Sequence, residues 1–428
     1  MVSTLAAQVR EQATQQRLML RRVEYLSGER REGLPLDVVS DVVSLLPVVD
    51  PLAGGTGAMR RLTACPVCTH SRFTIVCEWN KLLLHPGFGD GDARRYDFAV
   101  CHQCGVLFAS IRPTGQRYRD LLNRFIESSG KDPGTLNNPV LNPNPLSDAD
   151  RETLRARIAS GVFVSDHAHV PRSHQLGIAF KDRIELSSHV EILSSLLSLD
   201  GARVLEIRPR TGAILASLKR LHGAEVYGMP IFESQQFVLR ELYGIEASAM
   251  IEFEQFSIPY EPAFDLIIAH HMFTHALRPR EFLAEVRAHL RPGGHVYFYD
   301  ELDDVEFTAG TQSMIATLNP FHVQSADGAS FQRALEANGF EVVFLKGLEK
   351  RHLCLARASD TVRLTPPASG EIEARVTALR LARDRALLRL PETVRHETGE
   401  DWDALAERAV ASGIATLTEK GQLRVSRP

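Results

Sequence analysis

The stretch Val204–Gly212, with the sequence VLEIRPRTG, decides the fold. A short apolar run ends at Glu206, a tight segment follows, and after Gly212 the apolar residues recur at helical spacing. The pattern predicts a strand, a turn and a helix, the unit with which nucleotide-binding α/β domains usually begin. In such a unit the helix N-terminus faces the carboxyl edge of the sheet, where ligands bind. Where these turns usually carry glycines, this one carries Arg208 and Arg210.

An alternation of strands and helices is predicted to continue along the chain from this unit. The expected strands are Glu225–Gly228, a weaker one near Ala247–Ile251, Phe264–Ala269 and His295–Tyr299. The expected helices are Leu176–Leu199, Glu233–Tyr243, Arg280–Leu290 and Ser330–Asn338, and Arg291–Gly294 is an expected turn. Phe340–Leu345 and His352–Ala356 are predicted to close the sheet as an antiparallel pair. Repeated βα units require a largely parallel sheet, so the fold class is α/β and Rossmann-like.

Four of the six cysteines form two CxxC pairs, Cys65 with Cys68 and Cys101 with Cys104. Each CxxC turn presents two thiolates, and two such turns on adjacent hairpins complete a tetrahedral zinc site. The segments Phe73–Trp79 and Tyr96–Ala99 are predicted strands that bring the turns together, and His70 and His102 are expected at the surface. The pattern predicts a four-cysteine zinc ribbon, with free buried thiols or a redox pair as the alternatives.

The composition excludes several classes of function. The 428 residues are 44% hydrophobic and 24% charged, with a formal net charge of −4, so no global basic field attracts nucleic acid or anionic lipid. No segment approaches the length of a membrane-spanning apolar run, and the N-terminus lacks the pattern of a secretory leader. Cysteine usage fits a reducing compartment. The sequence therefore predicts a cytoplasmic protein with no membrane partner, and it gives little support to a nucleic-acid partner.

Five segments are predicted along the chain. They are an N-terminal helical segment (1–57), a zinc ribbon (61–126), a linker or lid (127–175), the sheet domain (176–358) and a C-terminal helical extension (359–428). The N-terminal segment contains expected helices over 3–27 and 34–49, and the extension contains Glu371–Leu388 and a short helix with Trp402. These terminal helices offer surfaces for packing or for a homo-oligomer. The linker histidines His167, His169 and His174 are assigned to solvent or a substrate cleft.

Together these pieces resemble the class I S-adenosylmethionine-dependent methyltransferases. Within them they look similar to the branch with an N-terminal zinc ribbon, which includes the nucleotide-sugar C-methyltransferases. The most specific string runs from Phe264 to Glu301, FDLIIAHHMFTHALRPREFLAEVRAHLRPGGHVYFYDE, and looks like the fourth strand, helix, RPGG turn and fifth strand of that family. The two CxxC pairs with a following Arg-Pro are similar to the ribbon of this branch. The resemblance covers about residues 61–126 and 176–357.

The resemblance implies methyl transfer from S-adenosylmethionine to a nucleotide-linked sugar or another small polar metabolite. In the family a glycine-rich E-x-G-x-G-x-G turn lies against the methionine part of the cofactor, and a carboxylate after the second strand binds the ribose hydroxyls. This sequence keeps Glu206 and Gly212 of the turn, whereas Arg208 and Arg210 replace two glycines. Pro230 stands at the position of the ribose carboxylate, and Glu233 offers a substitute.

Two histidines are the candidates for a base or for substrate orientation. His275 stands where the family usually has the histidine of a Glu-His pair, with Thr274 in place of the Glu. His322 aligns with a histidine that the sugar C-methyltransferases carry shortly before their last helix. The last predicted strand of the parallel set ends at Tyr299, Asp300 and Glu301. These residues are expected to face the ligand cleft, because that cleft lies at the carboxyl ends of the strands.

The two arginines leave two functions open. In an active methyltransferase they point outward or pair with Glu206, which leaves room for the cofactor. In a catalytically lapsed member, Arg208 and Arg210 bind an anionic ligand such as phosphate or carboxylate at a helix N-terminus, or they fill a collapsed cleft with ion pairs. The protein would then serve as a binding or assembly subunit.

Overall fold

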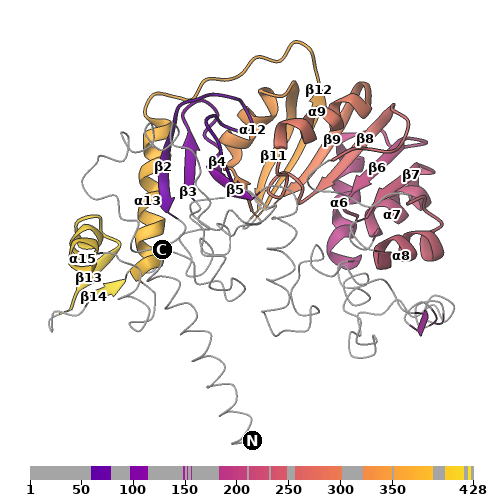
Figure 1. The fold of residues 1–428 in the computed structure, drawn as a ribbon. Coiled ribbons are helices and arrows are strands. Elements are labelled where there is room, and N and C mark those ends of the chain that lie inside the picture. Colours follow the sequence, from indigo (N-terminus) through magenta and orange to yellow (C-terminus); the bar gives the residue numbers. More distant parts are fainter. Residues whose placement is uncertain are drawn as a thin grey trace, which may run out of the picture. The chain divides into compact units, whose positions relative to one another are not determined.

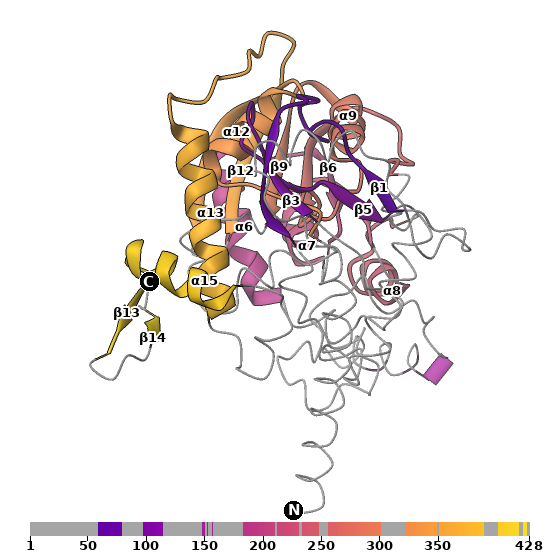
Figure 2. The same cartoon turned by 60° about the vertical axis from the view of Figure 1, so that its left-hand side comes forward.

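The computed structural model describes somewhat over half of the chain. The described residues are 59–78, 97–113, 148–149, 152, 156, 183–209, 212–230, 233–247, 256–300, 322–348, 351–388, 401–418 and 423–425. The predicted N-terminal helices, the three linker histidines, Arg210 and Glu301 lie outside these ranges. The described elements are drawn in Figure 1 and, from a second direction, in Figure 2.

The chain forms two compact units, and neither is continuous in sequence. The first contains residues 1–128, 302–334 and 364–428, and the second contains residues 129–301 and 335–363. This grouping follows contacts, whereas the five predicted segments follow the chain in order, so those segment boundaries stay a prediction.

The second unit contains a six-stranded mixed sheet in the order β11-β12-β9-β8-β6-β7 (Figure 1). Strands β6 (Arg203–Ile207), β7 (Glu225–Met229), β8 (Phe264–His270) and β9 (Leu290–Asp300) are parallel where they pair. Strand β12 (Arg351–Ala358) runs antiparallel to both β9 and β11 (Phe340–Leu348). The α/β class and the closing antiparallel pair are confirmed.

Four helices of this unit are described, α6 (Arg183–Leu196), α7 (Ala213–His222), α8 (Glu233–Tyr243) and α9 (Pro279–His289). Side chains of α6 and α7 share one apolar cluster with alternate residues of the strands, such as Leu193, Leu218, Val204 and Leu266. The intervening strand residues, such as Leu205 and Ile267, are also buried. Both faces of the sheet are therefore covered, as a parallel sheet requires.

One local prediction differs from the structure. The expected turn Arg291–Gly294 lies inside β9, because Leu290 already pairs with Phe264 before an irregularity in the ladder. Gly293, at φ 77°, provides the backbone conformation for this irregularity. The weak strand expected near Ala247–Ile251 stays a prediction, because residues 248–255 lie outside the described ranges; just before it, Glu246 forms a parallel bridge with Tyr227.

The first unit contains a four-stranded sheet in the order β10-β4-β3-β2. Strands β2 (Phe73–Glu78), β3 (Asp97–Cys101) and β4 (Leu107–Ala109) come from the predicted ribbon, and β10 (Gln324–Ser325) joins them from much later in the chain. A separate two-stranded sheet pairs β1 (Met59–Arg61) with β5 (Ile111–Pro113). Helix α12 (Gly328–Glu336) begins in this unit, and its last residues belong to the other.

The C-terminal extension contributes helix α13 (Glu371–Leu388), which has the predicted bounds and lies alongside β2 (Figures 1 and 2). Helix α15 (Trp402–Ala411) packs against α13 and is followed by strands β13 (Ala415–Leu417) and β14 (Leu423–Val425), which the sequence did not predict. Among the described residues, no helix combines the length and the apolar character that a bilayer-crossing segment needs.

Candidate functional site

The four predicted ligand cysteines meet in the first unit. The first turn is closed by hydrogen bonds from the amide of Cys65 to the carbonyl of His70 at 2.8 Å and from Thr69 back to Cys65 at 3.0 Å. The second turn follows β3, and the amide of Gly105 donates to the carbonyl of Cys101 at 3.0 Å. Gly105 adopts φ 77°, a backbone conformation that glycine enters without strain, so glycine suits the turn after the last cysteine.

The four sulfur atoms lie close enough together to hold one metal ion. All four Sγ atoms lie within 4.8 Å of one another, with Cys65 to Cys104 at 3.7 Å and Cys68 to Cys101 at 3.4 Å. Zn–S bonds of about 2.3 Å in a tetrahedron place sulfur atoms about 3.8 Å apart. Burial raises the pKa of Cys65 and Cys104, while thiol hydrogen bonds from the neighbouring cysteines lower that of Cys101. The cluster can therefore hold a metal ion.

Two buried arginines from distant parts of the chain brace the second cysteine turn. Arg333 on α12 donates to the carbonyl of Cys104 at 3.1 Å, and Arg375 on α13 donates to the carbonyl of Gly105 at 2.9 Å. Arg333 also pairs with Glu371 at 2.5 Å, and Arg375 pairs with Asp327. These contacts connect the predicted ribbon to the C-terminal extension, and no local sequence pattern indicates them.

In the second unit, Glu206 lies near the carboxyl end of β6 with no exposed surface. Neither of its carboxylate oxygens has a hydrogen-bond partner among the described residues. Burial raises the pKa of Glu206 to about 8. The backbone amide of Leu215 lowers this pKa in part, although its position relative to the carboxylate oxygens does not meet the geometry of a hydrogen bond. Since an unpartnered carboxyl group in the interior is costly, this position favours a cationic ligand group that could donate to it.

Arg208 follows directly after β6 and turns inward. Its residue is only 6% exposed, and its Nη1 donates to the carbonyl of His271 at 3.0 Å. The side chain therefore reaches from the end of β6 to the end of β8. Two of the sequence-based alternatives are wrong for Arg208, because it neither points outward nor pairs with Glu206.

The backbone at Arg208 adopts φ 64°, the left-handed region that glycine enters without strain. For a residue with a side chain, this conformation costs about 1–2 kcal/mol. The turn thus keeps the backbone shape of a glycine turn at the position where the sequence has replaced the glycine. The amide of Arg208 donates to the carbonyl of Met229 at 2.9 Å, which holds the turn against the end of β7.

Gly212 caps the N-terminus of helix α7 and is the glycine of the turn that the sequence retains. It adopts φ 72°, and a Cβ atom there would lie 2.4 Å from Cδ2 of Leu239 on α8. The close packing of α7 and α8 explains why this position stays glycine. Pro230, at the predicted ribose position, is buried directly after β7. Glu233 begins α8, but the direction of its side chain is not described.

Aromatic and histidine side chains gather around Tyr299 at the end of β9. Its ring centroid lies 4.4 Å from that of His189 on α6, 4.7 Å from His270 and 5.6 Å from His271. His189 Nδ1 lies 2.8 Å from the hydroxyl of Tyr297, and His271 donates its amide to the carbonyl of Tyr299 at 2.8 Å. The sequence singled out Tyr299 but missed His189, which lies on a helix in a stretch without a motif.

The two predicted catalytic histidines fall in different units. His275 is 3% exposed and lies with the buried Thr274 in the turn between β8 and α9. His322 precedes β10 in the first unit and is half-buried. Asp300 is the last residue of β9, and its side chain is not described. The structure therefore brings Arg208 to His271 after β8, but it does not test His275 and His322 as candidates for the base or for orienting the substrate.

Residues 179–345 match a family model described as a methyltransferase domain. This segment contains β6 to β9, β10 and most of β11, and the chain has a class I methyltransferase fold with a mixed sheet. The match covers less than half of the chain, and the cysteine cluster and the C-terminal extension lie outside it. No curated protein matches the sequence.

Several solved methyltransferases are structurally similar to part of the chain. An Aquifex aeolicus S-adenosylmethionine-dependent methyltransferase is 20% identical and has a TM-score of 0.33, with 41% of this chain and 93% of that chain covered. A Burkholderia thailandensis 1,6-didemethyltoxoflavin-N1-methyltransferase is 17% identical with a TM-score of 0.35, covering 51% and 94%. A Haloferax volcanii complex of the Trm112 activator with a methyltransferase is 13% identical with a TM-score of 0.34, covering 48% and 97%.

Proposed function

We propose that the chain is an S-adenosylmethionine-dependent methyltransferase of the zinc-ribbon branch, acting on a nucleotide-linked sugar or another small polar metabolite. The methyltransferase-domain match supports the reaction class. The observation that carries the proposal is Glu206, a fully buried carboxyl group without a partner among the described residues. The ammonium group of the cofactor's methionine part is a donor of the kind that this carboxyl group lacks.

In this proposal each named residue has one role. The bound cofactor supplies a methyl group on a cationic sulfur. Glu206 accepts a hydrogen bond from the cofactor's ammonium group, Gly212 permits the close packing of the turn, and Glu233 replaces the missing ribose carboxylate. His275 and His322 are the candidates for the base or for orienting the substrate. Zinc on Cys65, Cys68, Cys101 and Cys104 is structural, and a cytoplasmic location and a homo-oligomer formed by the terminal helices belong to the same proposal.

The second candidate is a catalytically lapsed member that acts as a binding or assembly subunit. A specific observation favours it: the buried Arg208 side chain bonds to the carbonyl of His271 and occupies volume beside the turn. A buried cation also opposes the binding of a cationic cofactor. The two candidates therefore differ in whether the turn accepts the cofactor with Arg208 in place.

The variant Arg208→Gly is expected to bind S-adenosylmethionine about tenfold or more tightly than the unaltered protein. Removal of the side chain vacates volume, removes a positive charge and leaves glycine in a left-handed conformation that it adopts freely. Calorimetry with S-adenosylmethionine and S-adenosylhomocysteine measures both proteins. Arg220→Ala is the control, because it removes an equal charge from an exposed position on α7. Absence of binding to the unaltered protein and to Arg208→Gly would exclude the enzyme and leave the lapsed subunit.

A further inference from the structure

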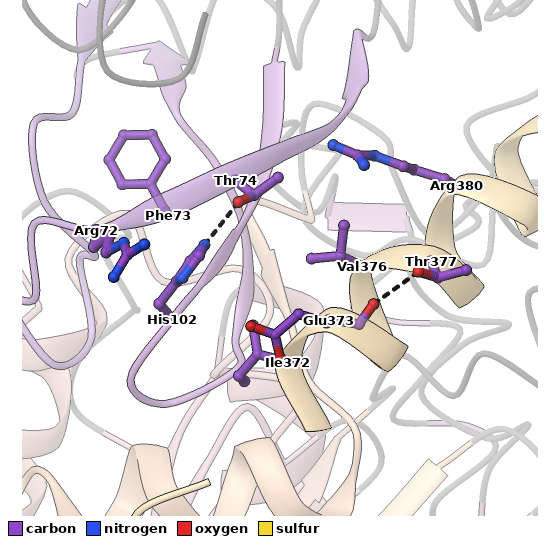
Figure 3. Close-up of a pocket in the computed structure, with 9 residues that line it drawn as sticks. All are labelled: Arg72, Phe73, Thr74, His102, Ile372, Glu373, Val376, Thr377 and Arg380. Carbon is purple, nitrogen blue, oxygen red and sulfur yellow. Dashed lines mark hydrogen bonds between the residues drawn. The ribbon is translucent and has the colours of Figure 1, made fainter. Parts of the chain in front are cut away.

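A cavity of about 310 Å³ lies within the first unit, between the ribbon sheet and helix α13 (Figure 3). One wall is formed by the start of β2 and the residue after β3, and the other by the first three turns of α13. This volume is at the lower end of the range of small-molecule sites, about 300–1,000 Å³. The cavity belongs to neither the cysteine cluster nor the carboxyl edge of the six-stranded sheet.

The charges around the cavity favour an anion. Arg72 approaches from the ribbon and Arg380 from α13, so the two guanidinium groups come from different walls (Figure 3). The Nη2 of Arg380 lies 3.4 Å from the carbonyl of Ile75, a contact that holds this side chain next to β2. Glu373 is the one carboxylate among the residues that line the cavity. Two cations against one anion leave a net positive lining before any contribution from histidine.

The remaining lining combines hydrogen-bonding groups with an apolar surface. His102 Nε2 and Thr74 Oγ1 lie 2.7 Å apart, so the two side chains orient each other at the ribbon wall. His102, predicted to lie at the surface, is thus half-buried beside the cavity. Ile372 and Val376 are buried on the helix wall and present apolar side chains opposite. Small-molecule sites typically combine an apolar wall with a few placed polar groups.

We propose that this cavity binds a small organic anion, a phosphate ester or a carboxylate, attracted by the positive charge of Arg72 and Arg380 at its two ends, with the organic part against Ile372 and Val376. Guanidinium groups suit both anions because their planar donor pairs match two oxygens of either group. The proposal goes beyond the methyltransferase function, since it requires neither the cofactor nor the carboxyl edge of the sheet.

The test is calorimetry of the full-length protein with phenyl phosphate, benzoate and inorganic phosphate, in the absence of S-adenosylmethionine. Phenyl phosphate is expected to bind several-fold more tightly than inorganic phosphate, because its ring contacts the apolar wall. Benzoate shows whether a carboxylate replaces the phosphate. Arg72→Gln and Arg380→Gln are each expected to weaken binding of phenyl phosphate about tenfold, and Arg220→Gln on α7 is the matched control.

Glu373→Gln is expected to act in the opposite direction, tightening phenyl phosphate binding several-fold because it removes the carboxylate that repels the anion. Loss of folding cannot mimic a gain of affinity, so this variant keeps the test decisive. The proposal is wrong if phenyl phosphate binds no better than inorganic phosphate, or if the Arg72 and Arg380 variants bind it like the unaltered protein. Single-stranded DNA, a larger polyanion, is titrated in the same way. The proposal is also wrong if Arg72→Gln and Arg380→Gln weaken the binding of single-stranded DNA and leave the binding of phenyl phosphate unchanged.

Discussion

Cys104→Ser is expected to release the metal and to unfold the ribbon sheet. Cys104 has no exposed surface, and its sulfur lies 3.7 Å from that of Cys65, so serine cannot take over a thiolate ligand there. Structural zinc sites contribute about 10–16 kcal/mol of binding free energy, which equals or exceeds the about 5–15 kcal/mol stability of a typical domain. Metal analysis is expected to give one zinc per chain before the substitution and none after it.

Hydrogen exchange locates this effect. The amides of β3 and β4 are expected to lose protection in Cys104→Ser, while those of β6 and β8 in the other unit keep theirs. Cys77→Ser is the matched control, because Cys77 is also buried in the ribbon sheet but lies outside the four-cysteine cluster. A metal-free unaltered protein with a fully protected ribbon would show that the cluster consists of free thiols.

Glu206→Gln is expected to stabilise the protein at pH 8 by roughly 4 kcal/mol and to leave it nearly unchanged at pH 4.5. Burial raises the pKa of Glu206 from 4.5 to about 8 in the folded protein. Between pH 4.5 and pH 8 the carboxyl group of Glu206 keeps its proton in the folded chain and loses it in the unfolded chain. The free energy of unfolding therefore falls as pH rises through this window, and glutamine, which carries no charge, removes the decline.

Urea unfolding of the six-stranded sheet at several pH values measures this difference. Glu246→Gln changes an exposed glutamate in the same unit and is expected to leave the pH dependence as it is in the unaltered protein. If a cationic ligand group binds Glu206, saturating S-adenosylmethionine should flatten the decline as well, because pairing stabilises the carboxylate. Parallel pH profiles for the unaltered protein and Glu206→Gln would show that Glu206 already has a partner.

Much of the fold could be predicted because its signals are local. The apolar runs at Val204 and Phe264 indicated buried strands, and helices α8 and α13 have the predicted bounds. Strand β10 could not be predicted, because two residues carry no periodicity and their pairing with β4 spans more than two hundred positions. The hairpin of β13 and β14 was missed for a similar reason, since each strand has three residues.

The candidate site divides in the same way. The CxxC spacing was sufficient to predict the cysteine cluster, because each turn places two thiols by its own backbone geometry. The role of Arg208 was not predictable, since its side chain bonds to a carbonyl sixty-three residues further along the chain. The same holds for Arg333 and Arg375, which reach the cysteine turn from α12 and α13.

The sequence alone therefore determined the α/β class, the four-cysteine cluster and the strand-turn-helix at VLEIRPRTG, because hydrophobic period and ligand spacing act over a few residues. Only the tertiary structure decided that Arg208 turns inward and that Glu206 is buried without a partner among the described residues. Burial and pairing of a charge depend on groups brought from distant strands, and the cost of an unpaired buried charge is set by that environment rather than by the residue itself.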